Sequence, residues 1–139
     1  MSKLLAGSRI LVVEDESLII FLIEEILTDA GCTSVSTAAT AAQAAALIET
    51  NAFDVAMLDM NLNGGNSYAL ADALGAAGVP FVFCTGNSAR DIAGPHSERP
   101  ILRKPFTDSQ LVQVLVRLIA GRSKPATPEK TDGIEISRS

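Results

Sequence analysis

The sequence has little with which to build a disulfide framework, a thiolate metal site or a membrane span. It contains two cysteines, Cys32 and Cys84, without the close spacing of metal ligands, so two reduced thiols are expected. The longest strictly apolar run, 18–23, is far too short to cross a bilayer, and the first residues lack the apolar stretch of a signal peptide. We therefore expect a cytoplasmic protein with no membrane association.

Basic residues are also scarce relative to acidic ones. The net charge is −5, and the segment 121–139 has four basic and three acidic residues, so residues 1–120 carry −6. An acidic domain offers no electrostatic footprint for nucleic acid, which argues against nucleic acid as a partner. Part of this acidity can instead be gathered in one site that binds a cation.

What the sequence does contain is the composition of one globular domain. The chain has 139 residues, of which 47% are apolar and 19% charged. We expect a folded domain over 1–120, followed by a flexible tail over 121–139, which has two prolines and mixed charge.

Short apolar segments that end in polar residues predict five strands. They lie at 9–13, 33–37, 55–61, 81–84 and 101–103, with Asp59 where the third strand leaves the sheet. Helical spacing of apolar residues and two capping boxes predict helices at 18–29, 40–50, 67–77 and 107–120, and 87–92 has room for one or two helical turns. This alternation predicts a three-layer α/β domain with a parallel sheet.

The first, third, fourth and fifth predicted strands each end in polar side chains. Because the carboxyl ends of parallel strands meet at one edge of the sheet, where ligands bind, these side chains are expected to converge. The residues are Glu14, Asp15, Asp59, Thr85 and Lys104.

The three carboxylates of this set would repel one another unless a cation neutralised them. Oxygen ligands suit Mg²⁺ or Mn²⁺. Asp15 and Asp59 are expected to ligate it directly, Glu14 through a water, and the backbone carbonyl of Asn61 as a further ligand.

The remaining two side chains suit a phosphoryl group carried on Asp59. The metal and the compact positive charge of Lys104 would neutralise the phosphoryl oxygens in transit, and the Thr85 hydroxyl would bond one of them in the product. Taken singly, Asp59 could be a strand-end cap, Thr85 a turn cap and Lys104 a surface lysine. The complete set favours the chemical interpretation.

In order along the chain, these motifs resemble the receiver domain of response regulators in two-component signalling. The matching segments are Val12-Val13-Glu14-Asp15, Leu58-Asp59-Met60, Thr85-Gly86 and Lys104-Pro105-Phe106. The resemblance implies a flavodoxin-like (βα)5 fold with strand order 2-1-3-4-5. It also implies that Asp59 accepts phosphate from a phosphohistidine on a sensor histidine kinase, with Mg²⁺ at Glu14, Asp15, Asp59 and Asn61, and that Lys104-Pro105 is a cis peptide.

Two features depart from the common receiver pattern. Ile101 stands three residues before the lysine, where receivers usually carry an aromatic switch residue. The run 80–86 resembles the single-domain FAT GUY group, although Cys84 and the pair Asn87-Ser88 differ from its motif. That resemblance implies a switch by ordering of the segment after Thr85. Asn87 is either a tuner of phosphate lifetime or a plain loop residue.

The favoured function is a stand-alone receiver that signals through contacts with an unknown downstream protein. Alternatively, it drains or relays phosphate between kinases. In both cases it catalyses only its own phosphotransfer and slow autodephosphorylation, so it is not expected to be an enzyme in the usual sense. The last predicted helix is apolar over more than one stripe, which indicates deep burial or a homodimer face built from Val112, Val116 and Ile101.

Three other classes fit less well. A small haloacid-dehalogenase-like phosphatase needs a second acid two residues after the nucleophile, where this chain has Asn61. A flavodoxin-type redox module would have its flavin phosphate repelled by residues 14–16, which are all acidic. A pseudo-receiver that binds partners constitutively would not need the complete set of acids, threonine and lysine.

Overall fold

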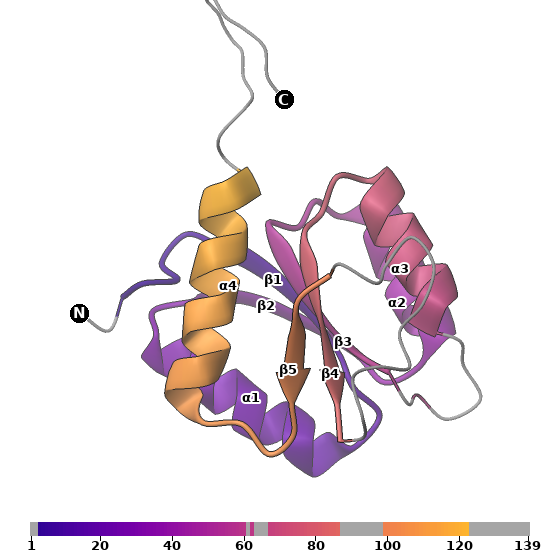
Figure 1. Cartoon of the computed structure of the whole chain (residues 1–139). Helices are drawn as coiled ribbons and strands as arrows, with labels where there is room; N and C mark the ends of the chain where they lie inside the picture. Colours follow the sequence, from indigo (N-terminus) through magenta and orange to yellow (C-terminus); the bar gives the residue numbers. More distant parts are fainter. Residues whose placement is uncertain (1–2, 61, 63–66, 87–98, 123–139) are drawn as a thin grey trace, which may run out of the picture.

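The computed structural model describes residues 3–60, 62, 67–86 and 99–122 (Figure 1). Five parallel strands form one sheet in the order β2-β1-β3-β4-β5, which confirms the predicted flavodoxin-like topology. The strands are β1 (Arg9–Val13), β2 (Ser34–Ala38), β3 (Val55–Asp59), β4 (Phe81–Thr85) and β5 (Ile101–Arg103). The helices of the described part are α1 (Ser17–Asp29), α2 (Ala41–Thr50), α3 (Ser67–Ala76) and α4 (Asp108–Arg122).

Helices cover both faces of the sheet, with α1 and α4 on one face and α2 and α3 on the other (Figure 1). Alternate strand residues point to opposite faces. In β1, Ile10 and Val12 therefore join the core under α1 and α4, while Leu11 and Val13 join the core under α2 and α3. All residues of β3 and β4 are buried, as expected for central strands covered on both sides.

Both predicted capping boxes place a helix start. The Gln110 N–H donates to Thr107 Oγ1 at 3.1 Å, and the Thr107 N–H donates to Gln110 Oε1 at 2.9 Å. At α2, the Gln43 N–H donates to Thr40 Oγ1 at 3.1 Å, but Gln43 Oε1 accepts from the N–H of Ala39 instead of that of Thr40. The box of Thr107 and Gln110 thus fixes the start of α4, the helix that follows the Lys104 loop.

The element bounds differ from the predicted ones by one or two residues. The second strand starts at Ser34, α3 ends at Ala76, and α4 continues to Arg122, two residues past its predicted end. Gly31, with φ of 95°, follows the Ala30 cap at the predicted end of α1. The helical turns expected at 87–92 lie outside the described residues.

The wide apolar surface of α4 is largely used within the chain. Leu111, Val114 and Leu115 are buried, and Val112 and Val116 are half-buried against the same core. This favours burial as the reason for the apolar pattern, and the homodimer face stays a prediction. Among the described residues, no helix combines the length and apolar character that a membrane crossing requires.

Candidate functional site

Three carboxylates lie together at the carboxyl edge of the sheet. Glu14 directly follows β1, and its N–H donates to the carbonyl of Ala38 at 3.0 Å, which extends the pairing with β2. Asp59 is the last residue of β3. One ligand oxygen from each of Glu14, Asp15 and Asp59 lies within 4.8 Å of the other two. Glu14 is 2% exposed and Asp59 4% exposed, whereas Asp15 is half-buried, so two of the three acids are largely withdrawn from solvent.

Lys104 supplies the positive charge that faces these acids. The main-chain N–H of Lys104 donates to the carbonyl of Thr85 at 2.8 Å, which holds Lys104 against the end of β4. Its Nζ lies 2.9 Å from Glu14 Oε1 and 3.6 Å from Asp59 Oδ1. The peptide bond to Pro105 is cis, as the resemblance implies. The amine therefore lies between the two most buried carboxylates, closest to Glu14.

Burial and charge shift the pKa values of this pair. Burial raises the pKa of the Glu14 carboxyl, and the hydrogen bond from Lys104 opposes that rise only in part. Burial lowers the pKa of the Lys104 amine, but the hydrogen bond to Glu14 and the charges of Asp59 and Glu14 outweigh it, so the pKa stands above its ordinary value. The lysine therefore stays protonated at neutral pH.

The donor set fits a hard divalent cation. Within the part of the chain that the structure describes, three carboxylates gather here and the Lys104 ammonium group lies beside two of them. Carboxylate oxygens are the ligands that Mg²⁺ prefers, and one or two carboxylates with a few waters make a typical magnesium site. The clustering of three carboxylates and the ligand type both point to Mg²⁺ or a similar cation.

Thr85 ends β4 at the same edge and is 2% exposed. Its strand places it beside the acids, because Asp59 pairs with Cys84 in the register of β3 and β4. Cys84 is fully buried, and burial raises the pKa of its thiol to about 12. This cysteine is thus a neutral core residue, as its sequence context predicts.

The other residues singled out from the sequence divide into two groups. Asn61 and Asn87 lie outside the described residues. Ile101 begins β5, three residues before Lys104, and is half-buried against the core under α2 and α3. Pro105 is exposed next to Lys104.

The sequence did not predict two features of the site. The hydroxyl of Ser67, at the start of α3, donates to the main-chain carbonyl of Asp59 at 2.6 Å. The only sequence signal for it is a small polar residue at a helix start eight positions after the aspartate.

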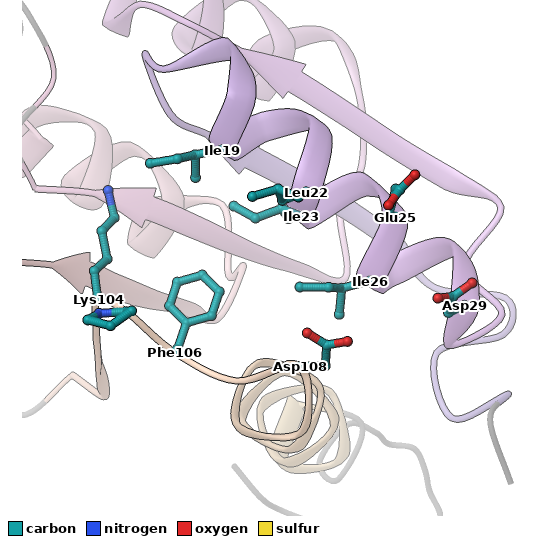
Figure 2. A pocket seen from close by; sticks show the side chains of 10 residues that line it. Ile19, Leu22, Ile23, Glu25, Ile26, Asp29, Lys104, Phe106 and Asp108 are labelled. Atoms are coloured by element: carbon teal, nitrogen blue, oxygen red, sulfur yellow. The ribbon is translucent and has the colours of Figure 1, made fainter.

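The second feature is an apolar groove beside the site. It has a volume of about 520 Å³ and lies between α1 and the segment that leads into α4. Figure 2 shows the α1 side chains and Phe106 around this groove, with Lys104 at one end and three carboxylates further along. The apolar lining includes Ile19, Leu22, Ile23, Ile26 and Phe106, and the carboxylates are those of Glu25, Asp29 and Asp108. On the same helix, Leu18 and Phe21 are 70% and 54% exposed, so α1 carries further exposed apolar side chains.

The family model described as "Response regulator receiver domain" matches residues 10–116 of this chain. The fold is similar to the BeF3-activated conformation of SdrG from Pseudomonas melonis Fr1, with 42% identity and a TM-score of 0.71 over 82% of this chain and 98% of that one. It is also similar to the receiver domain of the sensor histidine kinase PA1611 from Pseudomonas aeruginosa PAO1, solved with a magnesium ion coordinated in its active site cleft. That domain is 27% identical, with a TM-score of 0.70 over 83% of this chain and 99% of that one.

A curated relative is the transcription factor SKN7 of Saccharomyces cerevisiae. It is 29% identical over 122 residues, which cover 84% of this chain and 19% of that protein. The chain thus spans about a fifth of the length of this relative. None of these descriptions names the FAT GUY group, so that resemblance stays a prediction.

Proposed function

The chain belongs to the response regulator receiver family of two-component signalling, and on this premise we propose that Asp59 accepts a phosphoryl group from a sensor histidine kinase. Receiver domains are signalling domains and not enzymes in the usual sense. The observation that carries the proposal is the convergence of Asp59 with two further acids, within 4.8 Å, and with the Lys104 amine, at 3.6 Å. An aspartate with a purely structural role would not need two further acids and an amine around it.

In the proposed step, an oxygen of the Asp59 carboxylate attacks the phosphorus of the donor phosphohistidine. A P–O bond forms, the P–N bond breaks, and its electron pair stays on the imidazole nitrogen, which takes a proton and leaves as neutral imidazole. Lys104 stays protonated and places its charge where the phosphoryl oxygens would lie. Thr85, at the end of the neighbouring strand, supplies the hydroxyl expected to bond one of those oxygens in the product.

Glu14, Asp15, Asp59 and the Asn61 carbonyl are the groups we propose to hold Mg²⁺, Glu14 through a water. When bound, the cation neutralises charge on the transferring group. The side chains have a separate task, which is to position Asp59. The Lys104 amine contacts both Glu14 and Asp59, so it holds the two carboxylates in place before a donor arrives.

The experiment that tests the proposal is labelling of the purified chain with acetyl phosphate, with and without Mg²⁺, read by intact mass. We expect one phosphoryl group per chain, only when Mg²⁺ is present. In this reaction acetate leaves instead of imidazole, so no kinase is needed. Absence of labelling over a range of Mg²⁺ concentrations would contradict the proposal.

The groove of α1 supports a protein phosphodonor in particular. It opens beside Lys104 and offers apolar side chains, among them Leu22, which is 49% exposed. We infer that the donor packs here while its histidine reaches Asp59. Leu22→Arg should slow labelling by a histidine kinase that phosphorylates the wild type and leave labelling by acetyl phosphate unchanged. An equal effect on both reactions would mean that the variant disturbs the site and not the docking.

We infer that the phosphorylated domain acts in the cytoplasm through protein contacts. Phosphorylation adds about −1.5 to −2 charges, which is enough to reorganise neighbouring segments. The alternative is a relay, in which phosphate moves on to a second histidine-containing protein. A chase experiment separates the two: transfer of label from the phosphorylated chain to such a protein favours the relay, and loss of label to water alone favours the contact mechanism.

A further inference from the structure

Ser67 connects the phosphoacceptor to the helix that follows it. It is the first residue of α3, and its hydroxyl donates a 2.6 Å hydrogen bond to the main-chain carbonyl oxygen of Asp59, eight residues earlier. The residue is 4% exposed. Because a serine hydroxyl has a single proton, this bond uses the only donor that the side chain has.

The main chain just after Asp59 is thereby held from two elements. The N–H of Met60 donates to the carbonyl of Cys84 at 3.0 Å, which fixes the peptide to β4. The carbonyl of Asp59 belongs to the same peptide unit, and Ser67 fixes it to α3. Together these bonds set the plane of the peptide between Asp59 and Met60.

The helix that carries Ser67 is a rigid support. Leu70, Ala71 and Leu74 of α3 are buried in the core under α2 and α3. A hydroxyl on such a packed element can hold a reacting group in place more precisely than one on a mobile loop.

We propose that Ser67 is a positioning residue for the phosphorylation of Asp59. It acts through the backbone of the acceptor: it keeps the Asp59 carboxylate, one of the proposed metal ligands, close to Lys104 and to the other acids. This inference rests on the proposed function, because it concerns the same site.

The expected effect is on the reaction rate and on cation binding. A misplacement of about 1 Å can cost on the order of 100-fold in rate, so a partial loosening of one bond is expected to cost roughly 10-fold. In Ser67→Ala we expect slower labelling by acetyl phosphate and a higher Mg²⁺ concentration for half-saturation, measured by titration calorimetry. We also expect faster hydrogen exchange of the Met60 amide without any metal.

The chain offers a matched control in Ser8→Ala. Ser8 is also a buried serine, 9% exposed, but it precedes β1 at the opposite, amino end of the sheet. The Ser8→Ala variant removes a hydroxyl from a similarly buried position, so it controls for a general loss of stability. Labelling rate, Mg²⁺ affinity and Met60 exchange should all match the wild type in this variant.

A second pair of variants separates positioning from packing. Ser67→Thr keeps the hydroxyl and Ser67→Val has nearly the same shape without it. If Ser67 positions the acceptor, the threonine variant labels faster and binds Mg²⁺ more tightly than the valine variant, even if both are less stable than the wild type. Equal behaviour of this pair, or a folded Ser67→Ala with wild-type rate and Mg²⁺ affinity, would overturn the inference. Failure of the wild type itself to be labelled would instead contradict the proposed function.

Discussion

The sheet has charged side chains at both ends, and the two sets differ in balance and in burial. At the amino end, Arg9 and Asp54 form an ion pair. Two side-chain nitrogens of Arg9 lie 3.1 Å from the Asp54 oxygens, and the Arg9 N–H donates to Asp54 at 2.7 Å. The two side chains are 50% and 24% exposed.

At the carboxyl end, the described residues bring three carboxylates together with the Lys104 ammonium group. The side chains of Glu14 and Asp59 are 3% and 5% exposed, and Lys104 is shared between them. Burial makes an unbalanced charge costly. The amino end thus pairs one cation with one anion, whereas the carboxyl end gathers three acids whose mutual repulsion a bound cation would relieve. Strands β1 and β3 lead into both ends, so one scaffold holds an ion pair at one end and an acidic cluster at the other.

The largest expected effect comes from replacing Asp59, the last residue of β3. Asp54, which precedes β3, provides the comparison. Asp59→Asn should reduce labelling by acetyl phosphate to background, because a carboxamide cannot form the acyl phosphate. Asp54→Asn, five residues earlier, should label like the wild type, since Asp54 pairs with Arg9 at the amino end of the sheet. Intact mass after incubation with Mg²⁺ measures both. Full labelling of Asp59→Asn would mean that another residue is the acceptor.

A smaller effect is expected for cation affinity. Asp15→Asn removes a carboxylate of the cluster, whereas Glu16→Gln removes the adjacent carboxylate, which is exposed and outside the cluster. The first should weaken Mg²⁺ binding by at least the roughly 10- to 100-fold that loss of an outer-shell partner costs. The second should have little effect. Titration calorimetry compares them, and similar affinities in the two variants would remove Asp15 from the metal site.

The position of the acidic cluster could be predicted from the sequence, because the ends of the strands could be predicted. Each apolar run ends in its polar residue, and parallel strands bring such ends to one edge, so the position of Asp15, Asp59 and Thr85 at this edge could be predicted without a structure. The capping box at Thr107 likewise fixed the start of α4. These features depend on neighbours in sequence or on the topology of the sheet, which local patterns encode.

Other parts depend on contacts between distant residues and could not be predicted. The sequence suggested that Lys104 serves the phosphoryl group, but not that its amine lies nearer to Glu14 than to Asp59. It indicated Ser67 as a helix start, not as a donor to the Asp59 carbonyl. The groove arises because α1 packs beside the loop that carries Phe106, and no pattern in either segment alone predicts it.

The difference between the two ends should also appear in the dependence of stability on pH. Burial raises the pKa of Glu14 in the folded protein. Between the ordinary glutamate pKa, about 4.3, and this raised value, the folded state binds more protons than the unfolded state, so the free energy of unfolding falls as pH rises. Glu14→Gln should remove this fall. Chemical denaturation of both proteins without Mg²⁺ measures it, and curves that run parallel from pH 4 upward would contradict the assignment.

The smallest effect is expected at the amino end. Arg9→Ala removes an exposed pair, and exposed pairs contribute little because water and salt screen them. The variant should lose a small part of its stability at low ionic strength and almost none in high salt, and its labelling rate and Mg²⁺ affinity should equal those of the wild type. Thermal unfolding at two salt concentrations, with labelling by acetyl phosphate, provides the measurement. A marked fall in labelling would show that the two ends of β1 are coupled, and the division between a structural end and a reactive end would then have to be given up.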